Sequence, residues 1–150
     1  MNSFLYTLLI SMVPIIELRG GLPVGIASGL SFPVAYIAAV IGNLIPVPFI
    51  ILFIRRIFIL IRKYMPKLSS MIDKLENKAH LKGQKVRKYQ KFGLFIFVAI
   101  PLPGTGAWTG ALVAAFLDIR LKDAILPIVL GVLTAGILIM MLTYGVTTII

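Results

Sequence analysis

Charged residues are distributed very unevenly along the chain, and this distribution limits the fold more than any other feature. Four stretches contain no Asp, Glu, Lys or Arg: residues 1–16, 20–54, 92–117 and 124–150. A helix needs about 20 apolar residues to cross the hydrocarbon core of a bilayer. Only 13% of the residues are charged and 59% are hydrophobic, whereas a soluble domain has about 25% charged residues. The sequence therefore predicts an all-α integral membrane protein.

The segment from Arg55 to Lys91 holds 12 of the 15 basic residues. A basic run of this kind indicates either a nucleic-acid surface or a cytoplasmic loop that follows the positive-inside rule. The strongly hydrophobic flanks favour the loop and argue against nucleic acid as a partner. We therefore expect a multi-pass protein of the inner or plasma membrane, with the basic loop in the cytoplasm and both termini outside.

The N-terminal apolar run is expected to stay on the mature protein. No Lys or Arg precedes Phe4 and no small-x-small cleavage site precedes Glu17, so the run differs from a signal peptide.

Within the basic segment, apolar residues recur at helical spacing and form one stripe: Met65, Leu68, Ile72, Leu75 and Ala79. The other faces carry Lys67, Lys74, Lys78 and Lys82. Such a helix would lie on anionic lipids at the membrane surface or would pack against a dimer mate. His80 has no partner nearby in the sequence, and we interpret it as a surface residue.

The stretch 20–54 is too long for one membrane span and too short for two spans with a turn. We therefore predict a re-entrant hairpin with half-helices over about 3–13 and 21–30 and a loop over 14–20. A full span from Phe32 to Arg62 follows, with a bend at Pro46 and Pro48.

The stretch 92–117 is long enough to cross, but prolines and glycines interrupt its middle: Pro101, Pro103, Gly104 and Gly106. A continuous helix would lose backbone hydrogen bonds there, and lipid offers no replacement partners. A second re-entrant hairpin with arms over about 92–100 and 106–117 is the simplest interpretation. Residues 124–150 then form one outward span.

The two halves share a pattern of small residues. Gly21, Gly25 and Gly29 are matched 85 residues later by Gly106, Gly110 and Ala114. Such ladders let membrane helices pack closely, and two of them, each followed by a span, indicate an inverted-topology repeat. We predict one membrane domain with a first repeat over 1–61, a connector helix over 62–91 and a second repeat over 92–150.

Glu17 and Arg19 lie at the predicted tip of the first hairpin, where each ion costs about 2.5 to 3.5 kcal/mol. Intramembrane charges of this kind usually mark substrate or ion pathways, although a buried ion pair that joins the hairpins is the alternative. The candidate substrate and proton site contains Glu17, Arg19, Gly20, Gly21, Asn43, Pro103, Gly104, Thr105, Gly106, Trp108 and Thr109. The glycines are alternatively packing contacts, Trp108 an interfacial anchor and Asn43 a bridge between helices. The glycine-rich turns are expected to present free N–H groups of two helix N-termini, which with Arg19 favour an anion.

The strings Glu17-Leu18-Arg19-Gly20-Gly21-Leu22-Pro23 and Pro101-Leu102-Pro103-Gly104-Thr105-Gly106-Ala107-Trp108-Thr109-Gly110 resemble the family of small multidrug export proteins over nearly the whole chain. More distantly, that family resembles the DedA-type (VTT domain) membrane proteins, which have paired re-entrant hairpins with an acidic residue and an arginine. The wider resemblance implies a process that depends on the proton-motive force and a lipid carrier such as undecaprenyl phosphate. This chain differs in that its second hairpin has no charged residue.

Two classes of function remain open from the sequence. The first is a secondary transporter in which Glu17 carries a proton and Arg19 holds an anionic head group, with proton-coupled export of cationic drugs as a variant. The second is a non-transporting membrane scaffold. An enzyme is disfavoured, because no nucleophile and base pair is evident. We expect a homodimer without metal or cofactor, since six hairpin arms and spans are few for enclosing a polar cavity.

Overall fold

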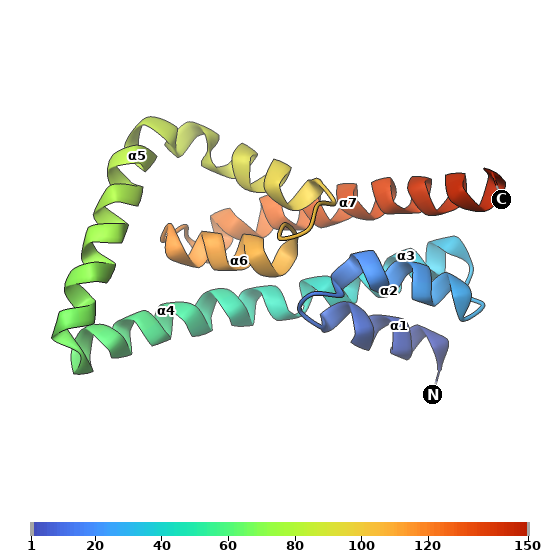
Figure 1. The fold of residues 1–150 in the computed structure, drawn as a ribbon, viewed down its shortest axis with the longest axis horizontal. Helices are drawn as coiled ribbons and strands as arrows, with labels where there is room; N and C mark the ends of the chain where they lie inside the picture. Colours follow the sequence, from blue (N-terminus) through green and yellow to red (C-terminus); the bar gives the residue numbers. More distant parts are fainter. Residues whose placement is uncertain (1, 150) are drawn as a thin grey trace.

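The computed structural model describes residues 2–149, except for the side chains of residues 75, 76 and 78–88. The helices are α1 (Ser3–Met12), α2 (Glu17–Ala27), α3 (Phe32–Leu44), α4 (Pro46–Tyr64), α5 (Pro66–Ala99), α6 (Ala107–Phe116) and α7 (Leu121–Ile149). The start of α1 and the end of α7 lie at one end of the molecule, and the connection between α4 and α5 lies at the opposite end (Figure 1). We call the latter the basic end, because α4 carries Arg62 and Lys63 in its last turn.

The first hairpin consists of α1 and α2, and its tip lies near the middle of the long axis (Figure 1). Asn2 caps α1 by accepting a hydrogen bond from Phe4 N at 3.2 Å. α1 ends before Pro14, because the residue that precedes a proline avoids helical angles. Glu17 N then donates to Val13 O at 3.0 Å. As a result α2 begins at Glu17, earlier than the expected arm over 21–30.

α3 and α4 together form the segment Phe32–Tyr64, which is long and apolar enough to cross a membrane. The two helices meet at Ile45, directly before Pro46, as expected from the missing N–H groups of Pro46 and Pro48. α7 passes the same test of length and composition. The all-helical fold of the described residues is consistent with the helical membrane protein that the charge distribution predicts.

α5 differs from the predicted connector. A separate connector over 62–91 and arm over 92–100 were expected, whereas one helix covers Pro66–Ala99. No proline interrupts this range, so the backbone can remain helical through a bend (Figure 1). Its last part, Tyr89–Ala99, is the apolar hairpin arm.

Only part of the predicted apolar stripe can be assessed. Met65 and Leu68 are exposed, and Ile72 is partly buried. The remaining positions of that prediction, Leu75, Lys78, Ala79, His80 and Lys82, lie outside the described side chains.

The end of α5 and α6 form the second hairpin, whose tip approaches the first tip from the opposite direction (Figure 1). The helix bounds agree closely with the expected arms over 92–100 and 106–117. Pro101 and Pro103 cannot continue α5. Gly104 and Gly106 take φ angles of 82° and 126°, which favour glycine.

Small residues hold the helices of each half close together. Gly21 and Gly42 both lie against α1, where an added Cβ would stand 3.0 Å from Ser11 Cβ. In the second half, Gly110 and Gly131 lie in the same way against Val98 of α5. These four glycines therefore act as packing contacts between helices.

The same contacts correct the predicted alignment of the glycine ladders. Gly29 lies in the turn after α2 and Gly106 lies before α6, so neither is part of a helical ladder. By its contacts Gly21 corresponds to Gly110, and not to Gly106. A ladder that repeats every four residues fits two registers one turn apart, so the sequence pattern could not choose between them.

The turns that follow α2 and α6 support the corrected alignment. Leu30 N donates to Gly25 O at 3.1 Å, and Ile119 N donates to Ala114 O at 2.9 Å. Both are the long hydrogen bond of a Schellman helix end. The residue at the turn has positive φ in each case, 88° at Gly29 and 54° at Asp118.

Candidate functional site

Glu17 of the first hairpin acts as a cap for a helix of the second. Its side chain is buried, with only 5% exposed, and its Oε1 accepts a hydrogen bond from Trp108 N at 3.1 Å. Trp108 is the second residue of α6. The first N–H groups of a helix lack partners in their own helix and carry the positive end of its dipole. The Glu17 carboxylate therefore compensates this helix end from across the hairpin interface.

Arg19 contacts the loop that leads into the same helix. Its guanidinium donates to the carbonyls of Leu102 and Thr105 and, at 2.7 Å, to Thr105 Oγ1. The Thr105 hydroxyl also lies 2.7 Å from Ile100 O and from Leu102 O. Because the guanidinium presents several donors in one plane, a single side chain satisfies several carbonyls of an irregular loop.

Glu17 and Arg19 do not pair with each other. The ion pairs found among the described residues are Arg55–Asp118, Arg62–Asp73 and Lys91–Asp123. Since positions two apart on a helix face different directions, each charge contacts the second hairpin instead. The carboxylate contacts N–H groups and the guanidinium contacts carbonyls, so two opposite charges stabilise two opposite kinds of backbone group.

A groove of about 370 Å³ opens beside these contacts. It brings together most residues of the predicted site: Glu17, Arg19, Pro103, Gly104, Thr105, Trp108 and Thr109. Trp108 also donates from Nε1 to Met12 O at 3.2 Å, so its indole joins the two hairpin tips. The lining combines the polar groups of Glu17, Arg19 and the two threonines with apolar residues at both tips and at Leu112.

The predicted glycines take different roles. Gly20 and Gly21 do not present free N–H groups to the site as expected, because α2 already begins at Glu17; Gly20 N, for example, donates to Ile16 O at 3.0 Å. At Gly106, in contrast, an added Cβ would overlap the Glu17 carboxylate. The absence of a side chain at Gly106 is what lets the carboxylate reach α6.

Asn43 lies on the inner side of Glu17, away from the groove. It is buried in α3, with 2% exposed, and its Oδ1 has no hydrogen-bond partner among the described residues. Asn43, Glu17 and Gly106 line a small hollow of about 10 Å³. That volume is close to the minimum for one water molecule.

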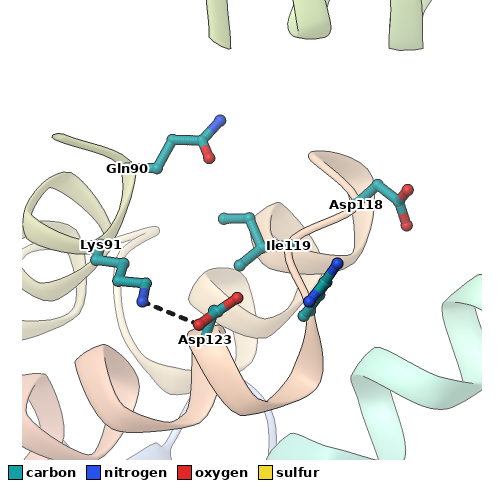
Figure 2. Close-up of a pocket in the computed structure, with 6 residues that line it drawn as sticks. Gln90, Lys91, Asp118, Ile119 and Asp123 are labelled. Atoms are coloured by element: carbon teal, nitrogen blue, oxygen red, sulfur yellow. Dashed lines mark ion pairs between the residues drawn. The ribbon is translucent and has the colours of Figure 1, made fainter. Parts of the chain in front are cut away.

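The basic end holds charged contacts that the sequence reasoning did not single out. Arg55 donates to Ile119 O and lies 3.9 Å from Asp118. Lys91 pairs with Asp123 at 2.9 Å beside a hollow of about 290 Å³. In Figure 2 the side chain of Asp118 is directed away from that pair. The one signal for Arg55 was its place as the first charge after the uncharged stretch 20–54.

A family model described as "Putative small multi-drug export protein" matches residues 17–138. The matched range includes Glu17, Arg19, the tip of the second hairpin and most of α7, and it begins after α1 and the loop that follows it. No curated protein and no solved structure matches the chain.

Proposed function

The chain belongs to the family of small multi-drug export proteins, and from this premise we propose that it is a proton-coupled secondary transporter with its site between two re-entrant hairpins. The observation that carries the proposal is the pair of contacts by which Glu17 and Arg19 join the tips. Charges buried at mid-membrane are expensive and typically serve transport. The opposed hairpins, the matching turns and the matching glycine contacts support an inverted repeat.

Protonation of Glu17 provides the coupling in this proposal. An ionised carboxylate makes a stronger hydrogen bond to Trp108 N, and a stronger interaction with the α6 dipole, than a neutral carboxyl does. Protonation therefore weakens one of the contacts that hold the tips together. The protonated state favours separation of the tips, and the ionised state favours their closure.

Arg19 provides the substrate contact. A phosphate or carboxylate in the groove competes with the Leu102 and Thr105 carbonyls for the guanidinium, and a charged acceptor makes the stronger hydrogen bonds. We propose an anionic substrate, with a phosphate-bearing lipid such as undecaprenyl phosphate as the favoured kind. Binding at Arg19 and protonation of Glu17 both release tip contacts, which links the two fluxes.

Export of cationic compounds is a second candidate. It is favoured because Glu17 lines the groove and makes no salt bridge to Arg19, so its carboxylate can attract a cation, although the charge of Arg19 nearby counteracts this attraction. Transport assays with one anionic and one cationic substrate separate the two candidates.

The direct test is a pair of substitutions in proteoliposomes with an imposed pH gradient. Glu17→Gln should keep the fold but remove the dependence of flux on the gradient, because an amide carries no exchangeable proton. Arg19→Lys should reduce flux about tenfold, roughly the effect of losing one charged hydrogen bond. Asp123→Asn and Arg120→Lys are matched controls, because neither residue lines this groove or the pocket around Arg55 and Arg62. Flux in Glu17→Gln that still responds to the gradient would refute proton coupling through this residue.

The tips also support a homodimer. Ile15 is 98% exposed and Leu102 is 55% exposed, in segments that are not helical. Irregular backbone at membrane depth requires cover by protein or water. We propose that a second copy provides this cover, and a monomeric mass by native mass spectrometry in mild detergent would contradict it.

Orientation follows from the positive-inside rule: we propose that the basic end faces the cytoplasm, near anionic lipids, in the plasma or inner membrane. Cysteines at Asn2, Asn77 and Thr148 test this in intact cells. Only the cysteine at position 77 should resist an impermeant thiol reagent, and labelling of that position alone would reverse the orientation.

A further inference from the structure

The groove of about 370 Å³ at the hairpin tips, which we call the central groove, continues along α6 toward the basic end. A second groove, of about 420 Å³, lies between α4 and α6 and has only apolar side chains: Ile54, Phe58, Leu112, Val113, Phe116 and Leu117. Leu112 lines this groove and the central groove alike, so the two meet at that residue. α4 and α6 lie side by side over this length (Figure 1).

At its other end the apolar groove meets a polar pocket of about 190 Å³. Phe58 lines both, and Arg55, Arg62 and Asp118 line the polar pocket. Arg55 Nε is buried without a hydrogen bond, because Asp118 at 3.9 Å is too far to accept one. The pocket therefore contains an unused donor on a cation.

The three hollows follow α6 along its length. Leu112 and Phe116 lie four and eight residues after Trp108, so these three side chains form one row along the helix. Trp108 lines the central groove, Phe116 lines the apolar groove, and Ala115 lines the polar pocket. The helix has 10 residues and spans about 15 Å. The path therefore covers about half of the roughly 30 Å hydrocarbon thickness.

We infer that these hollows form one binding track for a membrane amphiphile with a single anionic head group. The head binds at Arg55 and Arg62, and the apolar chain lies in the α4–α6 groove with its end toward Trp108. Charge complementarity supports an anionic head, since Arg55 and Arg62 line the pocket and Lys63 lies in the same last turn of α4 as Arg62, although Asp118 and Asp73 offset part of this charge. The inference rests on the proposed function, because the track gives a lipid-type substrate a route from one leaflet to Arg19.

The single tryptophan makes the track testable. Bromine quenches indole fluorescence at short range, so the full-length protein in phosphatidylcholine nanodiscs is titrated with a long-chain fatty acid brominated at its terminal carbon. Its matched probes are the same acid brominated next to the carboxylate and the uncharged terminally brominated alcohol. The terminally brominated acid should give saturable quenching of Trp108, the head-brominated acid less, and the alcohol only a non-saturable background.

Two arginine variants place the head group. Arg62→Gln should weaken the saturable binding about tenfold, as expected for loss of one charged hydrogen bond. Arg56→Gln removes the same charge one turn and a half away, outside the lining of the pocket, and should leave binding unchanged. If Arg62→Gln proves unstable, Val113→Phe, which fills the apolar groove, should reduce the saturable component instead.

Each other outcome overturns the track. Equal quenching by acid and alcohol would mean that Trp108 meets only bulk lipid. Stronger quenching by the head-brominated acid would place the head at the tips and not at the basic end. Absent quenching would mean that protein, such as a second copy, covers the groove. None of these results refutes the proposed function if Glu17→Gln still removes the dependence of flux on the pH gradient. Conversely, if quenching is saturable but flux in Glu17→Gln still depends on the gradient, the track stands and only the proposed function is refuted.

Discussion

The two hairpins share a type of outer turn and a pattern of glycine contacts but have opposite distributions of charge. The first carries Glu17 and Arg19 at its tip and an uncharged turn over 28–31. The second has an uncharged tip over 100–106, and its turn carries Asp118 and Arg120. At the tips, side chains of the first hairpin satisfy backbone groups of the second. The first hairpin thus contributes charged side chains to this contact, and the second contributes backbone groups of a helix start and the loop before it.

The arms show a second difference within the same packing. In α1 the face toward the glycines is made of Thr7 and Ser11, whose hydroxyls donate to the carbonyls of Ser3 and Thr7 at 2.8 Å. The corresponding face of α5 is made of Leu94 and Val98. The close approach of the helices therefore depends on the glycines of the neighbouring helices. The arm that faces those glycines can carry small polar residues, as in α1, or branched apolar residues, as in α5.

The largest expected effect is at the tips, where the comparison depends on Gly106. Gly106→Ala should cost about 3 kcal/mol or more, because its φ of 126° is almost restricted to glycine and the new Cβ would displace Glu17. Gly104→Ala is the matched control, with positive φ but open space, and should cost about 1 kcal/mol. Equal losses in denaturant unfolding would mean that the Glu17 contact adds no stability.

The packing glycines should give the next largest effect, of similar size in the two halves. Gly42→Ala and Gly131→Ala should each cost about 2 kcal/mol, because the added Cβ meets Leu8 backbone in one case and Val98 in the other. Gly93→Ala, with nothing within 4 Å, should be neutral or stabilising. A tolerated change in only one half, measured by thermal unfolding in detergent, would break the structural correspondence.

Substitutions in the turns after α2 and α6 should change the backbone contribution to stability in opposite directions, because Gly29 and Asp118 both have positive φ but only Gly29 is a glycine. Gly29→Ala should cost about 1 kcal/mol, since alanine disfavours a φ of 88°. Asp118→Gly should relieve the backbone at φ 54° while it removes the carboxylate near Arg55. Asp118→Asn separates the two contributions, because asparagine tolerates this conformation. If Asp118→Asn and Asp118→Gly lower the unfolding temperature equally, the carboxylate decides the stability of the turn.

The smallest effect concerns the exposed pair in Figure 2. Lys91→Gln should leave the unfolding temperature unchanged at physiological salt, because exposed ion pairs are screened and contribute little. A clear fall in the unfolding temperature of Lys91→Gln, together with its recovery in the double variant that adds Asp123→Asn, would contradict this expectation. It would show that the ion pair stabilises the charged turn of the second hairpin.

Much of the architecture could be predicted from the order of residues alone. Uncharged stretches, prolines and positive-φ glycines act locally, through solvation and backbone sterics, so the two hairpins, the helix boundary before Pro46 and the two long apolar segments appear near their expected positions. Glu17 and Arg19 were identifiable for the same reason, because a charge inside a long apolar stretch is costly wherever the chain folds.

Only the tertiary structure decided which groups these charges meet. Glu17 contacts the backbone N–H of a residue 91 positions away, and every residue except proline has such a group, so no residue pattern could identify it. The sequence also left open how the two glycine ladders align and whether 66–99 forms one helix or two. In both cases several arrangements satisfy the same local preferences. Burial in a shared interface selects among them, because only one arrangement lets Gly106 admit the carboxylate while Gly21 and Gly110 each pack against a neighbouring arm.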